Sequence, residues 1–169
     1  TPFRTSFYLE NSDISISGKL DSLFNAKVSG SKTQDEYNSL IESVRPLNEK
    51  YSDLVQQYQT ARQINDTAKM SQIETDADVV AKEMSQTQKN FIKNNPSSFV
   101  TPSLLKSLSY ELEATEIETL IDAMDTSVSK VPVIQELKTR VATMKSVAIG
   151  QKAPDFILND VNGNPVSLS

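Results

Sequence analysis

Residues 37–61 read YNSLIESVRPLNEKYSDLVQQYQTA, and this stretch decides the fold. Two series of side chains recur along it every seven positions, offset from each other by three: Tyr37, Val44, Tyr51 and Tyr58, and Leu40, Leu47, Leu54 and Ala61. Such a repeat is typical of a long helix that packs one stripe against a partner helix. Pro46 lies inside the repeat, but the unbroken register predicts one helix with a kink near Arg45 rather than two unrelated helices.

The next stretch supplies the partner helix. Asn65-Asp66-Thr67 is typical of a turn with a helix cap, an interpretation that we favour over a glycosylation sequon. A second apolar series then follows at alternating spacings of three and four: Met70, Ile73, Ala77, Val80, Met84, Thr87 and Phe91. Each helix of about 28 residues would extend roughly 40 Å at about 1.5 Å per residue. Residues 32–95 therefore predict a long antiparallel helical hairpin.

A new helix is predicted soon after the hairpin. The polar run 94–98 would end the second long helix, and Thr101 followed by Pro102 is typical of an N-cap with proline at the first helical position. The apolar face of this new helix would consist of four leucines: Leu104, Leu105, Leu108 and Leu112.

Two further short helices are predicted before residue 149. Thr115 and Glu118 have the spacing of a capping box, and Pro132 lies near the start of the last helix. Their apolar faces would consist of Ile117, Leu120, Ile121 and Met124, and of Ile134, Leu137, Val141 and Met144. Residues 96–148 therefore predict a compact helical cluster, and the chain as a whole is expected to be mainly α.

The N-terminal residues predict short strands. One side of an extended chain would carry Phe3, Thr5, Phe7 and Leu9. Ile14 and Ile16 then repeat the alternation. Ala26 and Val28 suggest a third strand, with residues 18–25 as its connection. Because three short strands cannot bury an apolar face alone, we expect residues 1–31 to be the last strands of a truncated β domain.

The sequence changes character again at residue 149. Gly150-Gln151-Lys152-Ala153-Pro154-Asp155-Phe156 precedes an apolar run, and Asn162-Gly163 separates that run from Val166-Ser167-Leu168. Asn-Gly between two apolar runs predicts a β-hairpin. We expect residues 149–169 to fold as such a hairpin.

Composition excludes most kinds of catalysis. The 169 residues include no Cys and no His, which removes thiolate nucleophiles, imidazole acid–base chemistry and ordinary zinc sites. The net charge of −5 without a basic run argues against a nucleic-acid partner, and no segment has the roughly 20 apolar residues of a membrane span. We therefore assign no catalytic residue, no cofactor-binding residue, no metal ligand and no cofactor.

Three groups of polar or aromatic residues have a functional and a structural interpretation, and we favour the structural one for each. The acidic group Glu111, Glu113, Glu116 and Glu118 lies at a predicted helix start, where negative charge is stabilised. Residues 160–164 resemble part of a calcium loop, but Pro165 replaces its glycine. The third group is tyrosines at heptad spacing, which predict a packing seam rather than a ligand-stacking surface: Tyr37, Tyr51 and Tyr58.

One family resemblance covers the C-terminal segment. The pattern of Gly150, Ala153, Pro154, Asp155 and Phe156, followed by Asn162, Gly163 and Val166-Ser167-Leu168-Ser169, resembles the start of TlpA-like thiol-disulfide oxidoreductases and of peroxiredoxins. The order of small β domain, helical region and this motif resembles exported bacterial proteins with a TlpA-like module, and so favours the first family.

The resemblance implies a redox function that lies outside the chain. In the TlpA-like family a Cys-x-x-Cys pair follows this hairpin, and a thioredoxin-like domain surrounds it. The expectation is a non-catalytic N-terminal fragment of a periplasmic or cell-envelope oxidoreductase that acts on protein disulfides. Two alternatives remain open: a fragment of a peroxiredoxin-type peroxidase, and a structural or binding module that forms a homodimer through the helical hairpin.

Overall fold

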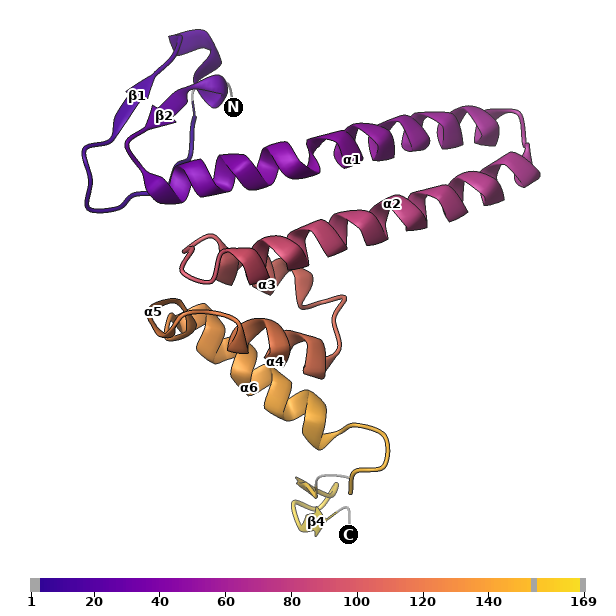
Figure 1. The fold of residues 1–169 in the computed structure, drawn as a ribbon. Helices are drawn as coiled ribbons and strands as arrows, with labels where there is room; N and C mark the ends of the chain where they lie inside the picture. Colours follow the sequence, from indigo (N-terminus) through magenta and orange to yellow (C-terminus); the bar gives the residue numbers. More distant parts are fainter. Residues whose placement is uncertain (1–3, 153–154, 168–169) are drawn as a thin grey trace.

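A computed structural model describes residues 4–152 and 155–167 and shows a mainly helical chain with a small antiparallel sheet near each end (Figure 1). The elements in chain order are β1 (Ser15–Ser17), the 3₁₀ helix η1 (Leu20–Asn25), β2 (Lys27–Ser29), α1 (Lys32–Gln63), α2 (Thr67–Asn94), α3 (Thr101–Leu108), α4 (Ala114–Asp122), α5 (Thr126–Ser129), α6 (Pro132–Ser146), β3 (Ile157–Asn159) and β4 (Pro165–Ser167).

Helices α1 and α2 form the long antiparallel hairpin that the two apolar series predict, and we call it the arm (Figure 1). Its outer half has its own small core, in which four side chains are at most 8 % exposed: Leu54, Ala61, Ile73 and Val80. Val44 is buried nearer the base, whereas Tyr37 and Tyr51 are 36 % and 42 % exposed. The seam therefore packs α1 against α2 within one chain, with two of the tyrosines at its edge.

Helix α1 continues through Pro46 as a single helix. Proline cannot donate to the carbonyl four residues earlier, which is that of Glu42. Both residues are exposed, so water can satisfy this carbonyl without a break in the helix. At the outer tip, Asn65 takes a positive φ of 54°, and the Asp66 carboxylate accepts a hydrogen bond from the Lys69 N–H at 3.0 Å. The predicted turn and cap are confirmed.

Helices α3, α4, α5 and α6 form the helical cluster, which packs against the base of the arm through one apolar core (Figure 1). Its central side chains are fully buried: Ile92 from α2, Leu105, Ile117, Val128 and Ile134. Leu112 belongs to the same core but lies beyond the end of α3, which stops at Leu108.

Two predicted helix caps are wrong. Thr101 is the first residue of α3 rather than its cap, and its hydroxyl donates to the Ser98 carbonyl at 2.8 Å. The capping box of α4 consists of Glu113 and Glu116, not Thr115 and Glu118. The structure starts the helix two residues earlier than a Thr115 cap would allow, and Ile117 then lies completely buried in the cluster core.

The N-terminal strands agree with the prediction only in part: the strand at Val28 and its connection over residues 18–25 form, but the first predicted strand does not. Residues 4–10 form no strand, and Phe3 lies outside the described residues; β1 pairs instead with β2, with Ile16 opposite Val28. We call this pair the N-terminal hairpin. The Tyr8 N–H donates to the side chain of Gln34 at 3.1 Å, and the Tyr8 ring lies 5.5 Å from that of Tyr37. Residues 4–10 therefore run along the first turns of α1 rather than beside a strand.

Glu10 joins the N-terminal residues to the start of α1. Its carboxylate accepts hydrogen bonds from the backbone N–H groups of Lys32 and Thr33 and from the Thr33 hydroxyl, the last at 2.6 Å. The N–H groups of a first helical turn have no partner inside the helix, and a negative charge there is favourable. The Thr33 hydroxyl above all, and then the two backbone N–H groups, hold the pKa of Glu10 below its ordinary value of 4.5.

This contact predicts a pH-dependent attachment of the N-terminal hairpin. The folded-state pKa of Glu10 is lowered. The stabilisation that its charge gives the fold is therefore complete above about pH 4.5, its ordinary pKa, and is lost as the pH falls through the lower folded-state pKa. Glu10→Gln removes the charge at every pH. Hydrogen exchange of the β1 and β2 amides should therefore be faster in Glu10→Gln than in the native chain at pH 6, and the difference should vanish in acid. An equal difference at pH 6 and pH 3 would contradict this prediction.

Candidate functional site

The residues of the family motif lie in and before a two-stranded C-terminal hairpin, formed by β3 and β4 with Leu158 opposite Val166. Gly150 has a positive φ of 88°, and the Ser167 hydroxyl donates to the Asp155 carboxylate at 3.1 Å. Ala153 and Pro154 lie outside the described residues. The predicted hairpin is thus confirmed over the part of this segment that the structure describes.

The turn of this hairpin contains Asn162 and Gly163, as predicted. The Gly163 N–H donates to the Asp160 carbonyl at 3.0 Å, and Gly163 has a φ of 84°. Asn162 does not have a positive φ, so the loop is a three-residue turn with glycine in the left-handed position rather than a two-residue Asn-Gly turn.

The calcium-like residues serve this turn. One Asp160 carboxylate oxygen accepts from the backbone N–H groups of Asn162 and Asn164, each at 2.8 Å, and the other accepts from the Asn164 side chain. These bonds, above all those from Asn164, lower the pKa of Asp160 below its ordinary value. Within residues 4–152 and 155–167, no group of three or more acidic side chains is arranged to hold a metal ion.

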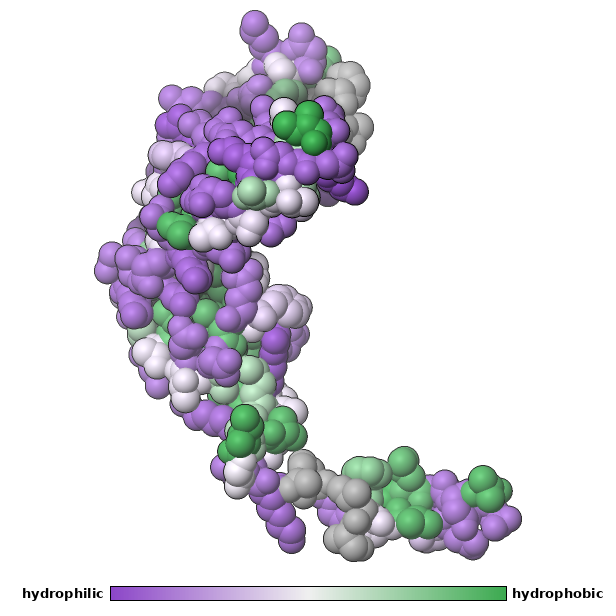
Figure 2. Space-filling model, turned by 90° about the vertical axis from the view of Figure 1, so that its right-hand side faces the viewer, coloured by the Kyte–Doolittle hydropathy of each residue, from purple (hydrophilic) through white to green (hydrophobic). Residues whose placement is uncertain are grey.

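The C-terminal hairpin exposes its apolar side chains. Four of them are between 51 % and 67 % exposed: Phe156, Ile157, Leu158 and Val166. The hairpin register and the two-residue period of strands place Phe156, Leu158 and Val166 on one face. In Figure 2 this end of the molecule lies away from the helices and displays hydrophobic surface.

The four predicted acidic residues do not converge on one site. Glu113 and Glu116 form the capping box, and Glu116 also pairs with Lys89 of α2 at 2.8 Å. The hydrogen bond from Lys89, and next the Glu113 backbone N–H, lower the pKa of Glu116. Glu118 pairs with Lys145 of α6. Glu111 alone of the four has a carboxylate with no hydrogen-bond or ion-pair partner among the described residues.

The three heptad tyrosines are separated as well. Tyr37 contacts Tyr8, and the Tyr58 hydroxyl donates to the Glu74 carboxylate at 3.0 Å, which raises the pKa of Tyr58. Tyr51 instead lies beside a hollow between the arm and the helical cluster. The predicted ligand-stacking alternative is therefore not assembled from these three side chains.

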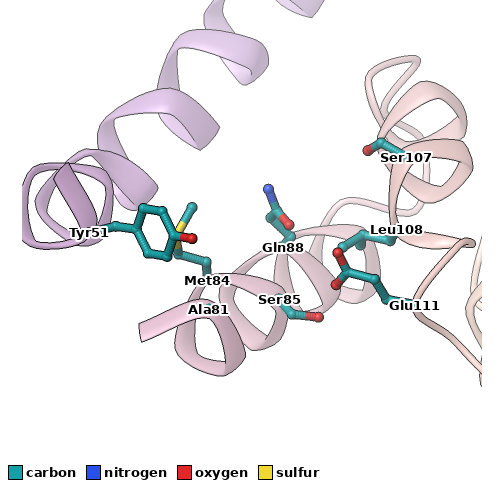
Figure 3. A pocket seen from close by; sticks show the side chains of 8 residues that line it. All are labelled: Tyr51, Ala81, Met84, Ser85, Gln88, Ser107, Leu108 and Glu111. Atoms are coloured by element: carbon teal, nitrogen blue, oxygen red, sulfur yellow. The ribbon is translucent and has the colours of Figure 1, made fainter. Parts of the chain in front are cut away.

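The hollow beside Tyr51 combines polar and apolar groups (Figure 3). Its volume is about 300 Å³, and its lining comes from α1, α2, the end of α3 and the turn that follows α3: Tyr51, Ala81, Met84, Ser85, Gln88, Ser107, Leu108 and Glu111. Figure 3 shows the Tyr51 ring on one side and the Glu111 carboxylate on the other, with Gln88 between them. Sequence reasoning missed this combination, because the three residues come from segments that only the packing of both α1 and α3 on α2 brings together.

Comparison with known proteins identifies one segment. A family model described as "Domain of unknown function (DUF4369)" matches residues 2–37, which include both N-terminal strands and the first residues of α1. No curated protein and no solved structure matches the chain. Among the described residues, no helix is long and apolar enough to cross a membrane.

Proposed function

We propose that this chain is the non-catalytic N-terminal portion of an exported bacterial thiol-disulfide oxidoreductase, in which the arm positions the redox domain or docks a partner. The observation that carries the proposal is the C-terminal hairpin. It has the residues of the family motif at Gly150, Asp155, Phe156, Asn162 and Gly163, and its turn contains Asn162 and Gly163.

The exposure of the hairpin supports the same proposal. An isolated two-stranded hairpin is at best marginally stable, and it normally needs further strands or a helix against its apolar face. Phe156, Leu158 and Val166 are each more than half exposed on one face. That face has the character of the first two strands of a larger sheet.

The proposed chemistry belongs to cysteines that follow the hairpin, in the periplasm or cell envelope. One thiolate would attack a disulfide of a substrate protein, form a mixed disulfide and release one substrate thiolate. The second cysteine would then displace the other substrate thiolate and close the enzyme disulfide. The substrate gains two electrons, and the enzyme dithiol is oxidised. The residues described above would hold this centre in place and take no part in the exchange.

The decisive observation is the coding sequence beyond Ser169. A Cys-x-x-Cys pair within about 30 residues supports the proposal. A single Cys in a Pro-x-x-x-Thr-x-x-Cys context would replace it with a peroxidase, and the absence of any cysteine would overturn both.

Activity of the full-length protein provides the second test. It should reduce insulin in the presence of a dithiol reductant, and a variant with both cysteines changed to serine should not. Equal turbidity from the two proteins would contradict a reductase function. A variant with the arm shortened between residues 47 and 84 should retain insulin reduction, because the arm is proposed to position or dock rather than to react.

A further inference from the structure

The loop of the C-terminal hairpin places an asparagine side chain beside an unshielded backbone nitrogen. Asn162 and Gly163 are both exposed, and the Asn162 side-chain amide has no hydrogen-bond partner among the described residues. A side chain on the residue after an asparagine normally shields the nitrogen of that residue, and glycine has no side chain. Apart from the two neighbouring residues, no atom lies within 4 Å of the ideal Cβ of Gly163. The rest of the fold therefore does not shield this nitrogen either.

We propose that Asn162 is a site of spontaneous deamidation and isomerisation to isoaspartate, whether or not the thiol-disulfide function proposed above is correct. The deprotonated Gly163 nitrogen attacks the side-chain carbonyl carbon of Asn162, and a five-membered cyclic imide forms. The bond from that carbon to the side-chain nitrogen breaks, and ammonia leaves with the proton that the Gly163 nitrogen gave up. Water then opens one of the two C–N bonds of the imide. One opening gives aspartate, and the other gives isoaspartate, whose main chain runs through the former side chain.

The folded loop opposes this reaction only weakly, because the hairpin is small. The Gly163 N–H donates to the Asp160 carbonyl at 3.0 Å, and the attack requires this hydrogen bond to open. Each strand has three residues, and the apolar side chains of Phe156, Leu158 and Val166 are more than half exposed. A two-stranded hairpin of this kind is marginally stable and opens at a free-energy cost close to zero. The loop therefore opens readily, and the Gly163 nitrogen becomes available.

Two other exposed asparagines in loops lack this combination. Asn164 lies in the same loop, but Pro165 follows it, and proline has no backbone N–H that could supply the attacking nitrogen. Asn65 at the tip of the arm precedes Asp66, whose N–H donates to the Ala61 carbonyl at 3.0 Å. Asp66 also has a side chain, and the outer core of the arm holds this turn closed. Both asparagines should therefore react much more slowly than Asn162.

Isoaspartate at position 162 is expected to disrupt the loop. It adds one atom to the main chain before Gly163, inside the loop that the hydrogen bond from the Asp160 N–H to the Asn164 carbonyl closes at 2.8 Å. The reaction also adds a carboxylate near that of Asp160, which accepts the Asn162 N–H at 2.8 Å. A longer main chain and a second negative charge both oppose the closed loop, and the pairing of β3 with β4 should weaken.

Peptide mapping by mass spectrometry tests the proposal on the whole chain, aged at neutral and at mildly alkaline pH. Electron-transfer fragmentation of the tryptic peptide that follows Lys152 should place the change from amide to acid at Asn162 and identify isoaspartate there. Conversion should be at least about tenfold faster than at Asn164 or Asn65, and it should accelerate with pH. The chain unfolded in urea provides the reference, and the native rate should lie within about tenfold of it.

Two variants with the same chemical change locate the reaction. Asn162→Gln should abolish conversion, because its longer side chain would have to form a six-membered ring, whereas Asn159→Gln on β3 should leave conversion at position 162 unchanged. Ageing should also remove the cross-strand nuclear Overhauser effect between Leu158 and Val166 from the native chain but not from Asn162→Gln.

Four results would overturn the proposal: no conversion at Asn162, equal conversion at Asn164, equal conversion in Asn162→Gln, or a native rate more than about tenfold below that of the unfolded chain. Persistence of the contact between Leu158 and Val166 after complete conversion to isoaspartate would overturn the expected disruption of the loop.

Discussion

Leu54→Asp is expected to melt the outer half of the arm, whereas Val55→Asp, one residue further on, is expected to leave it intact. Leu54 is 8 % exposed in a small core with Ala61, Ile73 and Val80, and Val55 is 41 % exposed. Removing a buried leucine costs about 2–5 kcal/mol, and a carboxylate left without a partner in its place adds to that cost. We therefore expect Leu54→Asp to destabilise the arm by at least about 3 kcal/mol and Val55→Asp by less than about 0.5 kcal/mol.

Circular dichroism and hydrogen exchange measure this difference. Leu54→Asp should lose helical signal and exchange protection over residues 47–84, while residues 96–148 keep theirs, because the helical cluster has a separate core. Sedimentation distinguishes the alternative in which the seam joins two copies of the chain. A native dimer that Leu54→Asp converts to a monomer with full helicity would show that the seam lies between chains.

The arm was predictable from sequence because both of its helices carry long apolar periods. A stripe sustained over residues 37–61 and again over 70–91 leaves little choice of partner when only a short polar turn separates the two. The cap of α4 was not predictable in the same way. Glu113 with Glu116 and Thr115 with Glu118 have the same spacing, and only the packing of Ile117 into the cluster core chooses between them.

Contacts between residues far apart in the sequence were the other feature that could not be predicted. The alternation of residues 3–9 is compatible with a strand, but Glu10 reaches Lys32 and Thr33, and Tyr8 reaches Gln34. No local sequence pattern indicates that the Glu10 carboxylate will cap a helix that starts 22 residues later. The same holds for Glu111, which a sequence pattern groups with Glu113 but which the fold places across a shared hollow from Tyr51.

Gly30→Ala is expected to detach the N-terminal hairpin, and the reason is a close backbone approach. Gly30 links β2 to the cap residue of α1, Ser31, and has a φ of 86°. A Cβ built there would lie 2.0 Å from the carbonyl oxygen of Asp13, a distance that requires the backbone itself to move. The left-handed conformation alone costs a non-glycine residue about 1–2 kcal/mol, and the overlap adds to this.

Gly150→Ala provides the matched control for this prediction. Gly150 has nearly the same φ, 88°, but no atom lies within 4 Å of its ideal Cβ, so its substitution introduces the conformational cost without the overlap. Hydrogen exchange should show lost protection of Val28 and its neighbours in β2 for Gly30→Ala, equivalent to at least about 2 kcal/mol. Gly150→Ala should leave those amides unchanged. If Gly30→Ala preserves their protection, then the Asp13 backbone moves to accommodate the methyl group. The close contact between Gly30 and Asp13 would then not be what holds the N-terminal hairpin in place.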